Sequence, residues 1–348
     1  YRMTDSYDLC LFSFGLESNS GDLILAGSNK TDDFVVTPDG QVLAVSEYDE
    51  DKKEWTLRYV TEPEKGRHLY KPVYQTKGQA LNHPNLIGLG RDGASVIISI
   101  NQGDNSLAGY HEISADGVLS PPLDPGGAGK DSTPLFHPNT LRLVGFSRHD
   151  DWVTHIYFDP LMKKLNDSLP KIVGDGYRSY IESCAEDPRQ MIVYTEGPGD
   201  AGSHYAVDLT TGAIAHIASN YPNIPEEWIT EKQAIDYKAA DGLNIHAYLT
   251  LPPFKDPKNL PLIVLPHGGP QARDYIGFDW QAQCLAAWGY AVLQPNFRGS
   301  AGYGNDFVVA GHGQFGRKMQ TDLSDGVRYL VGRGIVDAKR VAILGASY

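Results

Sequence analysis

The chain contains 348 residues, 41% of them hydrophobic and 21% charged, which are ordinary values for a soluble globular protein. Its 43 acidic residues outnumber its 30 basic ones, and the net charge of −13 argues against nucleic acid or an anionic membrane as a partner, because both bind basic surfaces. No apolar run approaches the roughly 20 residues of a membrane-spanning helix, so we expect a soluble protein, either cytoplasmic or exported.

The first part of the chain, residues 1–222, repeats a pattern of strand, turn and strand. Its turns are marked by Asp39, Asp92, Asn139 and Asp187, which follow one another at intervals of about fifty residues. Almost no helical pattern interrupts them. A repeat of this length with alternating strands and turns predicts a partial β-propeller of about four blades.

A second domain is predicted for residues 223–348, after the turn-rich segment 221–225. It opens with a hairpin over residues 234–249, which alternates on both sides of Asp241-Gly242. Buried strands and amphipathic helices then alternate, as in a doubly wound α/β sheet. The predicted elements are a strand at 260–266, a helix at 278–288, a strand at 290–293, a helix at 321–331 and a strand at 341–344.

Two motifs follow strands of this second domain. His267-Gly268-Gly269-Pro270 comes after the first strand, and Gly345-Ala346-Ser347-Tyr348 comes after the last. A strand followed by Gly-x-Ser-x is the start of the nucleophile elbow of α/β-hydrolases, and a Gly-rich loop after an earlier strand supplies an oxyanion donor there. We therefore predict Ser347 as nucleophile and the backbone N–H groups of Gly269 and Tyr348 as oxyanion donors.

From about residue 233 onward the chain resembles the catalytic domain of the prolyl oligopeptidase family, especially its acylaminoacyl-peptidase branch. The resemblance is carried by His267-Gly268-Gly269-Pro270, the segment 296–304, the helix with Asp322 and Asp325, and Gly345-Ala346-Ser347-Tyr348. It implies a serine peptidase acting on short peptides, with a β-propeller covering the active site. Relatives outside this branch have a tyrosine where His267 stands, so the second oxyanion donor is expected to be backbone.

A serine nucleophile needs a histidine base and a carboxylate that orients it, and in α/β-hydrolases both follow the serine in the chain. We therefore expect the Asp and His of the triad beyond residue 348. The few blades and the start at Tyr1 also suggest the middle of a longer enzyme. On this interpretation, the fold is a partial propeller plus an α/β-hydrolase sheet truncated after the elbow. Residues 1–348 alone are then expected to be inactive.

Four ionisable residues of the second domain admit more than one role. Arg298 either forms a buried ion pair or binds a substrate carboxylate. His267, at the end of a buried strand, is expected to be structural and not a general base. Asp322 and Asp325 are best explained by the favourable electrostatics of carboxylates near a helix start.

No metal or cofactor is expected. Cys10, Cys184 and Cys284 lie far apart and are predicted to be buried apolar side chains. Residues 88–93 have the glycine spacing of a dinucleotide loop, but a strand is predicted after them where that loop needs a helix. Residues 126–131 lack the leading glycine and the final Ser or Thr of a phosphate-binding loop.

Two other functions remain open at this point. An esterase would share the elbow and the oxyanion loop, although typical esterases do not carry repeated blades. Alternatively, the protein is a propeller-based binding module whose hydrolase half is inactive. The sequence also leaves open a homo-oligomer, the choice between exopeptidase and oligopeptidase action, and the preferred side chain before the cleaved bond.

Overall fold

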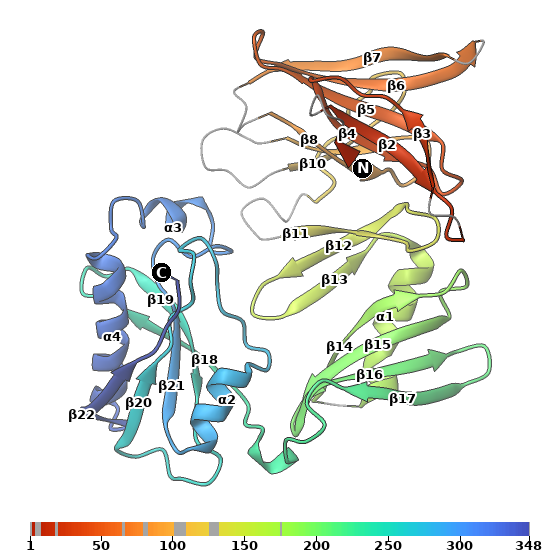
Figure 1. Cartoon of the computed structure of the whole chain (residues 1–348). Helices are drawn as coiled ribbons and strands as arrows, with labels where there is room; N and C mark the ends of the chain where they lie inside the picture. The colour runs from red at the N-terminus through yellow and green to blue at the C-terminus, as the bar shows by residue number, and fades with distance from the viewer. Residues whose placement is uncertain are drawn as a thin grey trace. The chain divides into compact units, whose positions relative to one another are not determined.

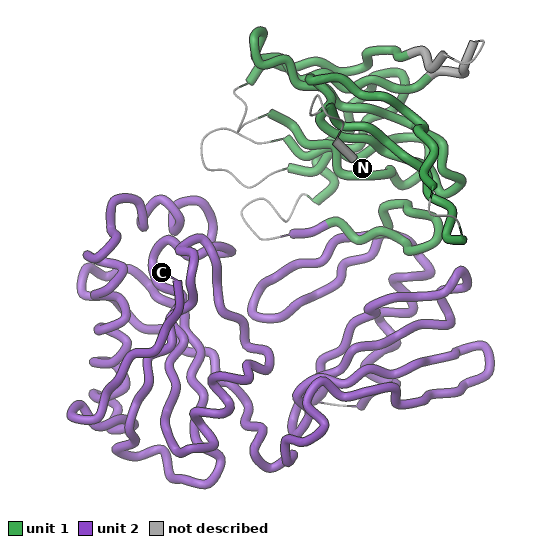
Figure 2. The backbone as a smooth tube through the Cα atoms, in the orientation of Figure 1, with its two compact units in different colours: residues 1–128, 134–144 green, residues 129–133, 145–348 purple. Residues whose placement is uncertain are grey.

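The computed structural model describes residues 2–3, 8–17, 20–64, 67–78, 83–100, 109–124, 132–174 and 176–347. It divides into two compact units, coloured in Figure 2. The first comprises residues 1–128 and 134–144, and the second comprises residues 129–133 and 145–348. Within the described residues, every helix is too short or too polar to span a membrane.

The chain up to residue 219 forms separate antiparallel sheets, each built from consecutive strands (Figure 1). Three of these sheets lie in the first unit. They are β1 (Arg2–Met3), β2 (Leu9–Phe14) and β3 (Gly21–Leu25); β4 (Thr31–Val36), β5 (Val42–Asp49), β6 (Glu54–Glu64) and β7 (Arg67–Lys77); and β8 (Asn85–Leu89), β9 (Val96–Ile100) and β10 (Gly109–Ile113).

The next sheet contains β11 (Ser132–Phe136), β12 (Leu143–His149) and β13 (Val153–Tyr157), and the boundary between the two units passes through it. The last antiparallel sheet lies in the second unit and contains β14 (Arg178–Cys184), β15 (Gln190–Gly197), β16 (Asp200–Asp208) and β17 (Ala213–Ser219). Neighbouring strands within it are joined by short turns, so its pairing is local.

The four sequence markers all lie in turns between the first two strands of a sheet. Asp39 lies between β4 and β5, Asp92 between β8 and β9, Asn139 between β11 and β12, and Asp187 between β14 and β15. The side chain of Asp92 accepts hydrogen bonds from the backbone N–H groups of Ala94 and Ser95, which explains the preference for Asp at such corners. The predicted strand–turn–strand repeats are confirmed.

One helix in this region was not predicted. α1 (Pro160–Val173) connects β13 to β14. Asp159 caps it by accepting hydrogen bonds from two backbone N–H groups of the first turn, and Pro160 occupies the first turn, where a missing N–H costs nothing. Met162, Leu165 and Leu169 recur at helical spacing and are buried.

The core of the first unit joins two of its sheets. Buried side chains of β4–β7 pack against those of β8–β10, with Trp55, Leu57 and Ile98 fully buried among them. A second, smaller cluster contains Leu25, Phe34, Val42 and Val45.

The cysteines differ in burial, although all were predicted to be buried, since Cys10 is buried but Cys284 is exposed. Cys284 lies on the outer face of a helix, so its expected role as a buried side chain is wrong.

The remainder of the second unit is built on a five-stranded sheet in the order β18–β19–β21–β20–β22. The strands are β18 (Gln233–Lys238), β19 (Asn244–Thr250), β20 (Leu260–Val264), β21 (Ala291–Asn296) and β22 (Val336–Ile343). β18 and β19 form the predicted hairpin around Asp241-Gly242. β20 pairs in parallel with both β21 and β22.

Helices cover both faces of this sheet (Figure 1). α4 (Lys318–Gly332) packs Leu323 and Leu330 against a face that includes Leu293. α2 (Trp280–Ala287) packs Ala282 against the adjacent Val292, which faces the opposite way because neighbouring side chains alternate along a strand. A short helix, α3 (Asn305–Val309), and a 3-10 helix, η1 (Glu226–Trp228), lie in connecting segments. The doubly wound arrangement explains the alternation seen in the sequence.

Candidate active site

Three loops meet at one edge of the five-stranded sheet. β20, β21 and β22 run parallel, so their carboxyl ends lie on the same side, where open α/β sheets bind ligands. The loop after β20 carries Gly269, one of the predicted oxyanion donors, the loop after β21 carries Arg298, and β22 leads to Ser347. The sheet therefore brings together motifs that are far apart in the sequence.

Ser347 has a backbone conformation that is unusual for a residue with a side chain. Its φ angle is 69°, in the left-handed region that favours glycine. A strand followed at once by a strained serine is the geometry in which a nucleophile elbow exposes its hydroxyl. None of the histidines that the structure describes hydrogen-bonds to Ser347.

Gly268 packs directly against this serine. A Cβ atom at residue 268 would lie 3.3 Å from the Cβ of Ser347 and 3.4 Å from the carbonyl oxygen of Ala346, which is closer than side chains normally approach. The absence of a side chain therefore lets the loop after β20 approach the serine closely. The two predicted motifs touch at this point.

Gly269, one predicted oxyanion donor, has a φ angle of 125° that only glycine adopts readily. Within the described part of the chain, no group accepts a hydrogen bond from its N–H. Tyr348, the other predicted donor, lies outside the described residues.

A cavity of about 280 Å³ lies beside the serine. Its lining is mostly apolar and comes from all three loops and from α4. The lining residues are Pro266, Phe297, Met319, Gln320, Leu323, Ile343, Gly345, Ala346 and Ser347.

Arg298 is buried and is held by two carboxylates. It donates to Asp322 from Nε and Nη2, at 2.9 and 2.7 Å, and to Asp241 from Nη1 and Nη2, at 2.8 and 3.1 Å. Hydrogen bonds to Asp322 and Asp241 raise the pKa of Arg298. Of the two roles considered for this residue, the geometry corresponds to the buried ion pair.

The explanation of Asp322 by helix-start electrostatics is wrong. α4 begins at Lys318, and Asp322 lies in its second turn with its side chain fully buried against Arg298. Its role is to neutralise a buried guanidinium. Asp325 is also buried, and its Oδ2 accepts a hydrogen bond from the backbone N–H of Ala240. Both carboxylates therefore anchor segments that precede the helix in the chain.

A polar network that the sequence analysis missed fixes the loop after β20. Asn296, fully buried at the end of β21, accepts from the N–H of Asp274 at 2.8 Å and donates to the hydroxyl of Tyr303 at 2.6 Å. Arg273 is buried and donates to the same hydroxyl at 3.1 Å. Burial raises the pKa of Asp274 to about 7, although the nearby Lys232 opposes the shift. The sequence signal for this network was the pair of adjacent charged residues, Arg273 and Asp274, in the loop after β20.

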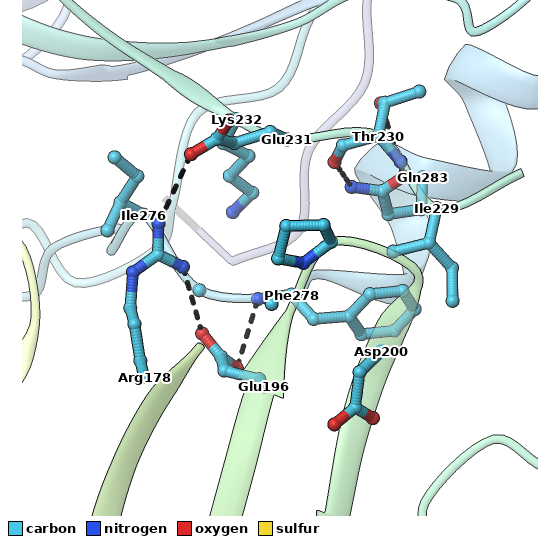
Figure 3. Close-up of a pocket in the computed structure, with 13 residues that line it drawn as sticks. Arg178, Glu196, Asp200, Ile229, Thr230, Glu231, Lys232, Ile276, Phe278 and Gln283 are labelled. Atoms are coloured by element: carbon cyan, nitrogen blue, oxygen red, sulfur yellow. Dashed lines mark hydrogen bonds and ion pairs between the residues drawn. The ribbon is translucent and has the colours of Figure 1, made fainter. Parts of the chain in front are cut away.

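A second, very small cavity of about 30 Å³ lies between β14–β15 and the segment that leads into β18 (Figure 3). Arg178 lies 3.6 Å from both Glu196 and Glu231, while Gln283 and Thr230 exchange backbone and side-chain hydrogen bonds. It shares no residue with the cavity beside Ser347 and holds little more than a water molecule. Among the described residues, no cluster of acidic, His and Cys side chains is suited to a metal ion.

Comparisons with known proteins match this architecture. Residues 276–348 match the model of the prolyl oligopeptidase family. The dipeptidyl aminopeptidase BIII of Pseudoxanthomonas mexicana is 31% identical over 271 residues, which cover 75% of this chain and 38% of that protein. The dipeptidyl peptidase family member 6 of Caenorhabditis elegans is 37% identical over 244 residues, which cover 62% of this chain and 32% of that protein.

The acylamino-acid-releasing enzyme of Mus musculus matches a shorter segment, with 33% identity over 93 residues that cover 27% of this chain and 13% of that protein. Among solved structures, a puromycin-hydrolyzing peptidase of Mycobacterium tuberculosis has the same fold. The TM-score is 0.61 at 20% identity, over 95% of this chain and 52% of that one. The chain spans less than two fifths of the length of each of the first two curated relatives. On its motifs, its fold and these matches, the chain is similar to proteins of the prolyl oligopeptidase family, whose model residues 276–348 match.

Proposed function

We propose that the protein is a serine peptidase that hydrolyses short peptides through an acyl-enzyme on Ser347. The observation that carries the proposal is the strained serine at the carboxyl edge of the sheet, in contact with the diglycine loop. The peptidase names of the matched relatives support the substrate class. The activity belongs to the complete protein, since the relatives are longer than this chain.

In this mechanism the Oγ of Ser347 attacks the peptide carbonyl while a histidine base takes its proton, and the carbonyl oxygen becomes an oxyanion. The N–H groups of Gly269 and Tyr348 donate to that oxyanion. The histidine then protonates the leaving amine, and a water molecule hydrolyses the ester on Ser347. In α/β-hydrolases the histidine and its orienting carboxylate follow the serine in the chain, and the proposal places both after Ser347 here.

The domain assignment is part of the same proposal. Residues 1–222 are proposed to be a partial β-propeller of about four blades, and residues 223–348 the first half of an α/β-hydrolase domain. Four antiparallel sheets with turn markers in equivalent places support the first assignment. The doubly wound sheet with parallel β20, β21 and β22 supports the second. Arg298 enters this proposal as half of a buried ion pair, because its guanidinium is already held by two carboxylates.

The test compares substrates on the complete gene product. Dipeptidyl and acetyl-aminoacyl p-nitroanilides report peptidase action at either kind of amino terminus, and a p-nitrophenyl acyl ester reports esterase action. We expect anilide hydrolysis that is lost in Ser347→Ala, together with loss of covalent labelling by a fluorophosphonate. Hydrolysis of the ester alone would favour an esterase, and no activity with a folded protein would favour a binding module.

A further inference from the structure

The side chain of His267 is held in a chain of short hydrogen bonds. Its Nδ1 lies 2.7 Å from the carbonyl oxygen of Gly268, and its Nε2 lies 2.9 Å from the Oγ of Ser300. The hydroxyl of Ser300 also lies 2.6 Å from the carbonyl oxygen of Phe297. The imidazole stacks on the ring of Phe297, with 4.6 Å between ring centroids and 17° between planes. The ring is therefore fixed in position and in rotation.

The partners determine which nitrogen carries the proton. A carbonyl oxygen can only accept, so Nδ1 must be the donor to Gly268. Burial lowers the pKa of His267, which favours the neutral ring; the hydrogen bond to Gly268 opposes this shift, and Arg273 adds to it. In the neutral ring Nε2 has a lone pair, and it accepts from Ser300 only when that hydroxyl turns its single proton away from the carbonyl of Phe297. If the ring is protonated, Nε2 donates to Ser300 instead, and Nδ1 still donates to Gly268.

The carbonyl that His267 holds belongs to a peptide group with a second function. The carbonyl of Gly268 and the N–H of Gly269 are parts of one planar unit and point in opposite directions. Fixing the direction of the carbonyl therefore fixes the direction of the N–H. With glycine at both 268 and 269, this peptide has few intrinsic restraints on its rotation.

We propose that His267 is a positioning residue, whose Nδ1–H holds the Gly268 carbonyl and thereby aims the N–H of Gly269 at the oxyanion beside Ser347. This inference rests on the proposed acyl transfer at Ser347. It assigns His267 neither to proton transfer nor to substrate contact. Ser300, fully buried, holds the opposite side of the ring and fixes its orientation.

Two substitutions separate positioning from general structural support. The amide of Asn can take the place of Nδ1, so His267→Asn keeps a donor to Gly268 and loses the contact with Ser300. The longer Gln reaches the place of Nε2, so His267→Gln keeps the contact with Ser300 and loses the donor. Both lose the stacking on Phe297, so we expect similar decreases in Tm.

For the complete enzyme acting on a peptide p-nitroanilide, we expect His267→Asn to keep kcat within about threefold of wild type. His267→Gln should lower kcat by about tenfold to a hundredfold with KM nearly unchanged, since removing an oxyanion donor outright costs about 100-fold to 1,000-fold. A matched control is His111→Gln. His111 is also buried and also donates from Nδ1 to a carbonyl, that of Ser120, but it lies in the first unit. It should lower Tm without changing kcat.

Equal kcat values for the Asn and Gln variants would overturn the inference, as would a loss in KM alone. Crystal structures of both variants test the geometry without reference to turnover. The Gly268–Gly269 peptide should keep its direction in His267→Asn and rotate in His267→Gln, and an unrotated peptide in the Gln variant contradicts the inference. If Ser347→Ala retains full turnover, the proposed function fails instead, and the crystal structures still decide whether His267 orients this peptide.

Discussion

Arg298 and Asp322 form a buried, two-pronged ion pair that ties the loop after β21 to α4. Nε and Nη2 of the guanidinium donate to the two carboxylate oxygens, and the backbone N–H of Arg298 donates to Asp322 as well, at 3.0 Å. Arg298 lies in the same loop as Ser300, which contacts His267. We therefore expect loss of the pair to affect both the stability of the sheet edge and the shape of the site.

Removing the side chain of Asp322 should lower the stability of the fold much more than removing that of Asp241. Asp322→Ala leaves a buried guanidinium without its main partner, and we expect the free energy of unfolding to fall by about 3–5 kcal/mol. Asp241 has a side chain that is 34% exposed, so Asp241→Ala should cost about 1 kcal/mol or less. Urea denaturation of the two variants checks this order. Equal losses would show that the carboxylates share the charge of Arg298 evenly.

Ser347 should be a source of strain that glycine relieves. A residue with a side chain at a φ of 69° costs about 1 kcal/mol or more, and Gly carries no such penalty. We expect Ser347→Gly to have a higher Tm than Ser347→Ala, although both lack the nucleophile. The comparison is made by differential scanning calorimetry, and an alanine variant as stable as the glycine variant would contradict the strain.

A methyl group at residue 268 should impair the site more than the fold. It would press on Ser347 and Ala346, so we expect Gly268→Ala to lower kcat at least tenfold and to change the free energy of unfolding by no more than about 1 kcal/mol. Gly332→Ala is the matched control. Nothing lies within 4 Å of a Cβ at residue 332, near the end of α4, and alanine should leave kcat unchanged while stabilising the helix slightly.

Asp274 should make stability fall as pH rises through the weakly acidic range. Burial raises the pKa of Asp274 to about 7, against about 3.9 in an unfolded chain. Between these values the folded protein binds a proton that the unfolded chain has released, so the free energy of unfolding decreases with pH from about 4 to about 7. The total decrease should be a few kcal/mol and should level off above pH 7.

Asp274→Asn should flatten this part of the stability profile. The amide stays neutral throughout, so its profile should diverge from that of wild type as pH rises from 4 to 7. Thermal unfolding at half-unit pH intervals measures the difference. Parallel profiles for the two proteins would show that Asp274 titrates normally in the fold.

Features that depend on local sequence could be predicted well. Asp92 and Asp187 accept hydrogen bonds from backbone N–H groups of their own turns, and Asp241 does the same in the hairpin at Asp241-Gly242. The candidate nucleophile was found because a strand followed by Gly-x-Ser has few other uses. Each of these signals is contained in a short stretch of sequence, so no tertiary contact has to be known to recognise it.

Features that depend on distant partners could not be predicted. α1 was missed because Pro160 and Pro170 hid a helical pattern that its cap and buried face make stable. The burial of Asp322 depends on Arg298, which comes from another element. The network of Asn296, Asp274 and Tyr303 likewise joins two loops that only the sheet order brings together.

The sheets from β4 to β17 each pair only with their own consecutive strands. Loop-closure entropy is therefore small for each of them, and every sheet can form while later parts of the chain are still being synthesised. The five-stranded sheet differs, because β21 inserts between β19 and β20, so these two strands must wait for residues that come later in the chain. Assembly of this sheet should consequently be the slow step of folding. In a ribosome-bound nascent chain that has emerged up to residue 219, the antiparallel hairpins should already be formed.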